Sequence, residues 1–421
     1  MNQFEYSRHQ PRSPFGFKTS NQKELAFSRQ RCVHREFQSA VLPVIEFVER
    51  SLVKTAQEVV STDLEYIASK LGPEFETMSG RSLLIIGGAG FLGYYLVQSV
   101  VHWNNVSGQA PIKITVFDNY MRGVPDWLKS IQDDDNLTLV THDITEPLPD
   151  NMADFDYIIH AASIASPIYY RQHALKTMDA NVGGLRYMLD YALAQHSKEK
   201  PIKGFLFFST SEIYGDPTPE SIPTPETYRG NVSCTGPRAC YDESKRYGET
   251  LCVVFAQQHD LPITIARPFN NYGPGLKISD RRVLPDFARD IFAERDIVMF
   301  SDGAPTRTFC YVADAVCGYY KILLNGKPGE AYNIGIEDPE ISMANLAERV
   351  IAIARDEFGY QGKAVFQVSE DKDYLVDNPN RRCPVIAKAR SDIGYDPEIG
   401  MDEGLRRAMI WYSGNRDAED M

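Results

Sequence analysis

The sequence lacks the cysteine spacing that would indicate a disulfide framework or a zinc site. Seven cysteines are scattered over 421 residues, and none of them forms a CxxC pair. An odd number of dispersed cysteines is typical of reduced thiols, since disulfide-rich chains are small and carry paired cysteines. The eight histidines also lack metal-ligand spacing. We therefore expect no metal site, and we predict a cytoplasmic protein.

Positive charge is also in short supply. Lys and Arg number 44 against 57 Asp and Glu, which leaves a net charge of -13 at pH 7. Nucleic-acid-binding proteins normally present a basic surface, so this balance argues against a nucleic acid as partner. An anionic substrate would have to be bound by a few local arginines. The sequence has no GxSxG motif either, so a serine hydrolase has no support.

Hydrophobic runs of membrane-spanning length are interrupted. Residues 82–112 contain no Asp, Glu, Lys or Arg, and length alone would allow a membrane span there. However, the glycines of GGAG (87–90) follow after only five residues, and Trp103, Asn104 and Asn105 end the second half. We interpret the stretch as a buried strand, a glycine turn and a buried helix, with no membrane association. The polar N-terminus lacks the apolar run of a signal peptide.

Short β-branched or aromatic runs alternate with helical segments through the central part of the chain. The expected strands are residues 82–86, 113–118, 137–143, 156–162, 205–210 and 262–268, and the expected helices are residues 91–103, 175–195 and 241–259. This alternation is typical of βαβ units. It predicts an α/β fold with a Rossmann-type doubly wound parallel sheet.

Three parts are expected along the chain. Residues 1–80 form an N-terminal helical extension, in which apolar residues at helical spacing between positions 36 and 70 predict two amphipathic helices. Residues 81–270 form the Rossmann domain. Residues 271–421 form a smaller C-terminal substrate-binding domain, from which residues 309–335 are expected to return to the sheet.

A glycine-rich loop stands directly between the first expected strand and helix. Gly87, Gly90 and Gly93 form GxxGxxG, a pattern that permits a tight turn, close approach of a pyrophosphate and tight helix packing. Asp118 ends the next strand, where a carboxylate can accept the ribose hydroxyls of NAD and repel a 2′-phosphate. The loop and the acid predict NAD, while the nearby Arg122 leaves NADP open. The alternative is a glycine turn that serves packing alone.

Tyr241 and Lys245 form a YxxxK pair at the start of an expected helix, one turn apart on one face. An unperturbed tyrosine titrates near ~10, and a nearby ammonium lowers that pKa toward the range of a base. Thr210 ends an expected strand at the sheet edge where α/β sites form. The alternatives are a solvated helix face for YxxxK and a helix cap for Thr210.

Seven blocks in chain order carry a family resemblance. They are GGAGFLG (87–93), FDNY (117–120), HAAS (160–163), STSEIYGDP (209–217), GPRACYDESKRYGET (236–250), ARPFNNYGP (266–274) and PTRTFCYVAD (305–314). With them, the chain resembles the extended short-chain dehydrogenase/reductase family of NAD-dependent epimerases and dehydratases. Within that family it most resembles the UDP-glucuronate decarboxylases, also called UDP-xylose synthases. The likeness runs from about residue 82 to residue 411.

The resemblance implies an NAD cofactor, a nucleotide-sugar substrate with UDP favoured, and a homodimer. It also implies a 4-keto intermediate, through which a UDP-glucuronate-like nucleotide uronic acid loses carbon dioxide and becomes a pentose. The implied catalytic residues are Thr210, Glu212, Tyr241, Lys245 and Arg307, with Arg307 facing the sugar. The expected cofactor-binding residues are Gly87, Gly90, Phe91, Leu92, Gly93, Asp118, Asn119, Asp143, Ile144, Ala161, Ala162, Ser163, Asn181, Tyr241 and Lys245. The expected substrate-binding residues are Tyr170, Ser211, Asn270, Arg282, Phe300 and Arg307.

Several alternatives stay open on the sequence. The same site would serve a nucleotide-sugar 4-epimerase or a 4,6-dehydratase, and a non-catalytic NAD-binding scaffold is a further class. Arg307 would then be an ordinary surface ion-pair residue. Pro285 and Asp286 stand where the family pattern suggests Ser-Asn, and Val385 stands where an aspartate is usual. These departures leave the nucleotide base and the exact sugar open.

Overall fold

The computed structural model describes residues 54–198, 200–373 and 376–416. The first of the two helices expected in the N-terminal extension lies outside these residues. The second is present as α1 (Ala56–Lys70), which begins with a capping box between Thr55 and Glu58. None of the helices in the described part of the chain is long and apolar enough to cross a membrane.

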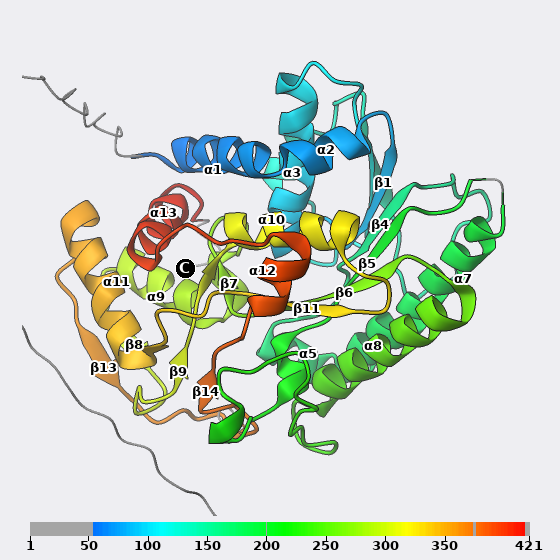
Figure 1. Cartoon of the computed structure of the whole chain (residues 1–421). Helices are drawn as coiled ribbons and strands as arrows, with labels where there is room; N and C mark the ends of the chain where they lie inside the picture. Colours follow the sequence, from blue (N-terminus) through cyan, green and yellow to red (C-terminus); the bar gives the residue numbers. More distant parts are fainter. Residues whose placement is uncertain (1–53, 199, 374–375, 417–421) are drawn as a thin grey trace, which may run out of the picture. The chain divides into compact units, whose positions relative to one another are not determined.

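A seven-stranded, wholly parallel sheet forms the centre of the described fold (Figure 1). In spatial order the strands are β11 (Ala331–Ile334), β6 (Ile263–Pro268), β5 (Gly204–Phe208), β4 (Tyr157–His160), β1 (Ser82–Ile86), β2 (Lys113–Asp118) and β3 (Leu137–Thr141). The order reverses between β1 and β4, which is the switch point of a Rossmann sheet. The predicted fold class is confirmed, and ligands of such sheets bind beyond the carboxyl ends of the strands at this point.

Helices cover both faces of the sheet. Alternate residues of each strand point to opposite faces, so each strand packs apolar side chains against both helical layers. On β1, Leu83 and Ile85 belong to a cluster built with α3 (Phe91–Val106) and α10 (Val312–Asn325). Leu84 and Ile86 belong to a second cluster with α7 (Leu185–His196) and α8 (Ala239–His259). This two-sided burial explains the continuous apolar run of the strand.

The helices α1 and α2 (Gly72–Met78) belong to the first of these clusters. Phe75 of α2 is fully buried, and its ring lies 5.6 Å from Trp103 and 5.0 Å from Tyr320. Asp63 of α1 is also fully buried and accepts hydrogen bonds from Tyr95, Tyr311 and Arg407. Residues 56–78 of the expected extension therefore contribute to the core.

Residues after β6 build short sheets and helices beside the main sheet. The helices here are α9 (Val283–Phe292), α11 (Met343–Phe358), α12 (Ala387–Ile393) and α13 (Met401–Gly414). A three-stranded sheet contains β12 (Ile341–Ser342), β9 (Thr306–Arg307) and β14 (Arg381–Arg382). The parallel register of β9 and β14 pairs Arg307 with Arg382, which places two arginines that are distant in sequence next to each other.

Candidate active site

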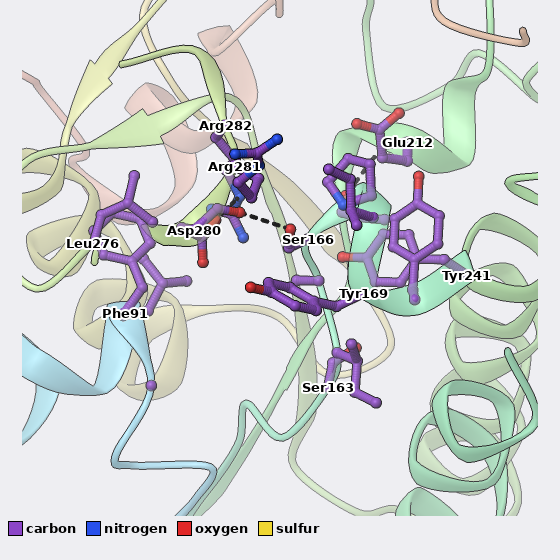
Figure 2. A pocket seen from close by; sticks show the side chains of 18 of the residues that line it. Phe91, Ser163, Ser166, Tyr169, Glu212, Tyr241, Leu276, Asp280, Arg281 and Arg282 are labelled. Carbon is purple, nitrogen blue, oxygen red and sulfur yellow. Dashed lines mark hydrogen bonds and ion pairs between the residues drawn. The ribbon is translucent and has the colours of Figure 1, made fainter. Parts of the chain in front are cut away.

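A cavity of about 930 Å³ opens at the carboxyl edge of the main sheet. Its lining brings together the glycine loop, the ends of β2, β4 and β5, the start of α8, and segments around residues 280–287 and 298–301. Figure 2 shows Tyr241 and Glu212 on one side of it, with Asp280 and Arg282 across from them. Every residue that the sequence predicted for the site lines this cavity, except Asn181.

Two glycines of the loop are needed for close backbone contacts. Gly87 has φ +83, and a Cβ there would lie 2.6 Å from the Cα of Ala162. A Cβ on Gly93 would lie 2.1 Å from the carbonyl oxygen of Gly88. Gly90 is the N-cap of α3 and supplies no side-chain cap, so the first N–H groups of that helix are free for a phosphate.

Asp118 ends β2 beside the glycine loop. Its carboxylate accepts from the backbone N–H of Ala89 at 3.0 Å and of Tyr120 at 2.8 Å, and burial raises its pKa. Arg122 is the residue that kept NADP possible in the sequence analysis. Its guanidinium forms an ion pair with Asp280, with Nη1 2.9 Å from Oδ2. The open helix terminus and the adjacent carboxylate fit the pyrophosphate and ribose of a dinucleotide.

Other predicted cofactor residues complete this side of the cavity. Asn119 and Asp143 lie together, with the Asn119 amide donating to the Asp143 carboxylate at 3.1 Å. Ser163 follows β4, and its hydroxyl is buried without a hydrogen-bond partner among the described residues, as a ligand-binding hydroxyl would be. Asn181 instead lies fully buried behind the cavity, where its amide donates to Ser244 at 2.9 Å.

Tyr241 lies in the first turn of α8 and is buried at 6% exposure. Its ring stacks on Tyr170, with centroids 4.9 Å apart and planes 5° apart. Burial raises the pKa of Tyr241 to about 12, and a hydrogen bond with Thr210 opposes that rise. Thr210 also accepts from the backbone N–H of Glu212 at 3.2 Å. The residue therefore caps the short helix Ser211–Tyr214, as the capping alternative proposed, and contacts Tyr241 as well.

Lys245 is one helical turn beyond Tyr241 and almost completely buried. Its ammonium donates to the carbonyl oxygen of Phe208 at 2.7 Å and lies 6.0 Å from the centre of the Tyr241 ring. Burial lowers the pKa of Lys245 to about 7. The ammonium is thus anchored to the end of β5 and lies over the Tyr241 ring, one turn away as the YxxxK spacing predicted.

Glu212 stands at the centre of an arginine cluster next to Tyr241. It forms ion pairs with Arg238 and Arg382. Burial alone would raise its pKa, but Arg238, Arg382 and Arg307 together lower it to about 2. Asp242 lies 3.6 Å from Arg238, and burial together with the charge of Glu212 raises its pKa to about 7. The cluster therefore carries more positive than negative charge.

Arg307 also lies in this cluster, and its guanidinium donates hydrogen bonds to uncharged amide oxygens. It is 7% exposed and donates to the carbonyl oxygens of Thr306 at 2.7 Å and Asn380 at 3.2 Å, and to Asn378 Oδ1 at 3.3 Å. Burial and the neighbouring Arg382 lower its pKa to about 9. Within the described ranges no carboxylate comes within the 4.0 Å of an ion pair with it. The surface ion-pair alternative for Arg307 is therefore wrong.

Comparison with known proteins assigns the chain to a family. The sequence model described as the NAD dependent epimerase/dehydratase family matches residues 83–335. The chain belongs to this family. The predicted likeness to UDP-glucuronate decarboxylases is confirmed too. UDP-glucuronic acid decarboxylase 5 of Arabidopsis thaliana is 37% identical over 327 residues, covering 78% of this chain and 88% of that protein. UDP-glucuronic acid decarboxylase 1 of Xenopus tropicalis is 32% identical over 379 residues, covering 86% and 82%.

Solved structures of the family share the fold. A UDP-glucose 4-epimerase from Thermotoga maritima matches with a TM-score of 0.66 at 22% identity, covering 79% of this chain and 98% of its own. A dTDP-glucose 4,6-dehydratase from Streptomyces venezuelae matches with a TM-score of 0.68 at 24% identity, covering 80% and 98%. NAD, the cofactor predicted from the sequence, is the cofactor of this family.

The two arginines that pair with Glu212 were not predicted from the sequence. Arg238 stands three residues before Tyr241, one turn back on the same helix face, and that spacing was a usable signal. Arg382 lies far along the chain, and the family pattern around it drew attention only to Val385. Its position follows from the pairing of β14 with β9, which no local pattern reveals.

Proposed function

We propose that this chain is an NAD-dependent nucleotide-sugar decarboxylase that converts UDP-glucuronate, or a closely similar nucleotide uronic acid, to the corresponding nucleotide pentose. One observation carries the proposal beyond the family. Arg307 and Arg382 are adjacent and line the cavity; Arg307 is buried, Arg382 is half-buried, and Arg307 has no carboxylate partner within ion-pair distance among the described residues. A buried guanidinium without an anion is unfavourable until one binds, and the substrate would supply both a diphosphate and a carboxylate.

The first step assigned to the chain is removal of a proton. Bound NAD supplies the chemistry of accepting a hydride from C4 of the sugar and later returning it. Tyr241 takes the proton of the C4 hydroxyl, while Thr210, hydrogen-bonded to Tyr241, orients that hydroxyl. Because burial holds the pKa of Tyr241 near 12 in the structure, the base becomes effective only when positive charge is brought close to the phenol.

The second step is loss of carbon dioxide. Once C4 is a ketone, the carboxylate on C5 is β to it, so the C–C bond breaks with its electron pair delocalised into an enolate. Arg307 and Arg382 orient the carboxylate and balance the enolate charge. A proton then adds at C5, and Tyr241 returns its proton to the C4 oxygen as C4 is reduced again. The net change replaces carbon dioxide by a proton.

The residues of the cavity suit the two rival reactions, 4,6-dehydration and 4-epimerisation, less well. A 4,6-dehydratase must protonate a departing C6 hydroxyl, and three arginines keep Glu212 ionised with a pKa near 2, which makes it a poor acid. A 4-epimerase acting on a neutral sugar would leave the arginine pair without a carboxylate. The non-catalytic scaffold would have no use for the assembled Thr210, Tyr241 and Lys245.

The deciding experiment is to incubate the purified protein with a panel of nucleotide sugars and nucleotide uronic acids and to determine product masses. The proposal expects loss of carbon dioxide from UDP-glucuronate with no net accumulation of NADH. Inversion at C4 with the carboxylate retained would establish the epimerase, and loss of water would establish the dehydratase.

We further propose that the chain acts as a homodimer, formed by α7 and α8 with the same helices of a second copy. Large apolar side chains stand exposed on these neighbouring helices, namely Tyr187, Tyr247 and Val254 at 38%, 51% and 37%. Light scattering is expected to give twice the chain mass, and Val254→Glu to give a monomer, whereas Val368→Glu, at 93% exposure, leaves the dimer intact. A wild-type monomer at all concentrations would refute this. We also propose a cytoplasmic location, which the scattered, unpaired cysteines favour.

A further inference from the structure

Asp280 lies in the cavity wall and holds two arginines. Its side chain is 4% exposed, and Oδ2 accepts from Arg122 Nη1 at 2.9 Å. Arg282 Nε is 2.9 Å from Oδ1, close enough for an ion pair although not aligned as a hydrogen bond. The main-chain oxygen of Asp280 accepts from Ser166 Oγ at 2.8 Å, as Figure 2 shows. Asp280 thus contacts Arg122 and Arg282 through its carboxylate and Ser166 through its main-chain oxygen.

Arg122 belongs to the cofactor side of the cavity. It follows Asp118 by four residues in the loop after β2. Its guanidinium lies 5.5 Å from the ring centre of Tyr169, and its carbonyl oxygen accepts from Lys277 Nζ at 3.2 Å. Both its side chain and its backbone are therefore tied to the segment that contains residues 277–280.

The same segment covers the start of α3. Gly275 has φ +90, and a Cβ there would lie 2.4 Å from the Cβ of Tyr94, so the chain passes directly over that helix. The guanidinium of Arg282 lies 6.0 Å from the ring centre of Phe91. Residues 275–282, which we call the strap, therefore pass over the start of α3 and end at Arg282 in the cavity wall.

We infer that Asp280 is a positioning residue which, through Arg122 and Arg282, fastens the strap of residues 275–282 to the cofactor loop and so retains the cofactor between the two hydride transfers. This rests on the proposed function, in which the hydride taken from C4 returns to C4. Such a cycle works only if the reduced cofactor stays bound while carbon dioxide leaves. Asp280 touches neither reacting atom, and it acts through the two arginines.

The inference predicts different effects for its two contacts. Arg122 follows the strand that ends at Asp118, whereas Asp280 also pairs with Arg282, which lines the cavity and is predicted to bind the nucleotide sugar. Arg122→Gln should therefore weaken retention of the cofactor without changing the affinity for UDP. Asp280→Asn should weaken both, because it removes the charge that holds Arg122 and Arg282.

The test measures binding rather than turnover. Each purified protein is loaded with NADH, and its dissociation is followed by fluorescence after addition of excess NAD; affinity for UDP is measured by calorimetry on the NAD-loaded protein. We expect Arg122→Gln and Asp280→Asn to speed NADH release about 5- to 10-fold, the size of one lost ordinary hydrogen bond, because the Arg122 side chain is partly exposed to water. Only Asp280→Asn should also weaken UDP binding. Arg349→Gln, which breaks an ion pair with Asp402 outside the cavity, is the matched control.

Two further results decide the inference. Arg122→Lys keeps the charge and should restore part of the NADH retention. The double variant Arg122→Gln/Asp280→Asn should release NADH no faster than Asp280→Asn, because Asp280→Asn by itself already breaks the contact with Arg122. NADH release from Arg122→Gln at the wild-type rate would overturn the inference, as would additive effects in the double variant. Failure of the decarboxylase proposal would instead appear as absence of carbon dioxide with these binding results unchanged.

Discussion

Tyr241 and Tyr170 lie face to face, with ring centroids 4.9 Å apart and ring planes 5° apart. Tyr170 comes from α5 (Pro167–Gln172), far from α8 in sequence, and its hydroxyl has no hydrogen-bond partner within the part of the chain that is described. The stack restricts rotation of the Tyr241 ring, so its hydroxyl is held toward Thr210. Orientation of the base is thus a packing effect as well as a hydrogen-bonding one.

Replacing the phenol tests this arrangement. Tyr241→Phe keeps the ring and its stack on Tyr170 but removes the hydroxyl, so we expect the fold and NAD binding to persist. Loss of the general base should slow turnover about 10²- to 10⁴-fold. Steady-state rates of the variant check the loss of turnover, and its melting temperature checks that the fold persists. Near-normal turnover would mean that Tyr241 and Lys245 are only part of a helix face.

Arg307→Lys tests how the carboxylate is held. Lysine keeps a charge but loses the planar, two-pronged donor geometry that suits a carboxylate. Oxidation at C4 should continue, because it depends on Thr210, Tyr241 and Lys245, while decarboxylation slows sharply. A 4-keto uronic acid that retains its carboxylate should then accumulate, detectable by mass and by transient NADH absorbance.

Arg381→Lys provides the matched control for that variant. Arg381 neighbours Arg382, pairs with Glu340 at 2.6 Å and does not line the cavity. Its replacement should leave the product distribution unchanged. Equal behaviour of the two variants, with no trapped intermediate in either, would remove Arg307 from the proposed mechanism.

Asp63 should make stability depend on pH. Burial raises its pKa from 3.8 to about 6, so the folded state binds a proton that the unfolded state has released between those values. Stability from this group therefore falls as the pH rises through that window, by up to about 3 kcal/mol in all. We expect the free energy of unfolding of the wild type, relative to Asp63→Asn, to fall between pH ~4 and ~6 in urea titrations. Parallel curves for the two proteins would contradict this.

Phe75→Ala tests whether the extension contributes to the core. The side chain is fully buried against Trp103 and Tyr320, so its removal leaves a cavity and should cost about 3–5 kcal/mol of unfolding free energy. Phe366→Ala removes the same group at a site that is 57% exposed and should change stability by less than about 0.5 kcal/mol. Equal, small effects in chemical denaturation would mean that α2 packs loosely.

The sequence was most informative where one segment carried the whole signal. The strand, glycine loop and helix at residues 82–103 were predicted because their turn chemistry and periodicity are local. The expected single helix at residues 175–195 instead divides into α6 (Ala174–Met178), a wider turn at Asp179–Gly184, and α7. Gly184 lies there against Ile144, and a Cβ would be 2.9 Å from its carbonyl oxygen. The wider turn therefore lies where another segment approaches the helix closely, and helical periodicity does not report such a contact.

The amino-acid sequence by itself determined the alternation of strands and helices that predicts a Rossmann sheet, the dinucleotide loop and the Tyr241–Lys245 pair, because the pattern that identifies each element or motif is local. Only the tertiary structure decided the charge of the site. Glu212, Arg238, Arg307 and Arg382 are separated by up to 170 residues, and their ionisation depends on burial and on mutual distances of a few ångströms. Electrostatic energy in a buried cluster falls with distance in space rather than along the chain, so the pairing of β9 with β14 made this cluster.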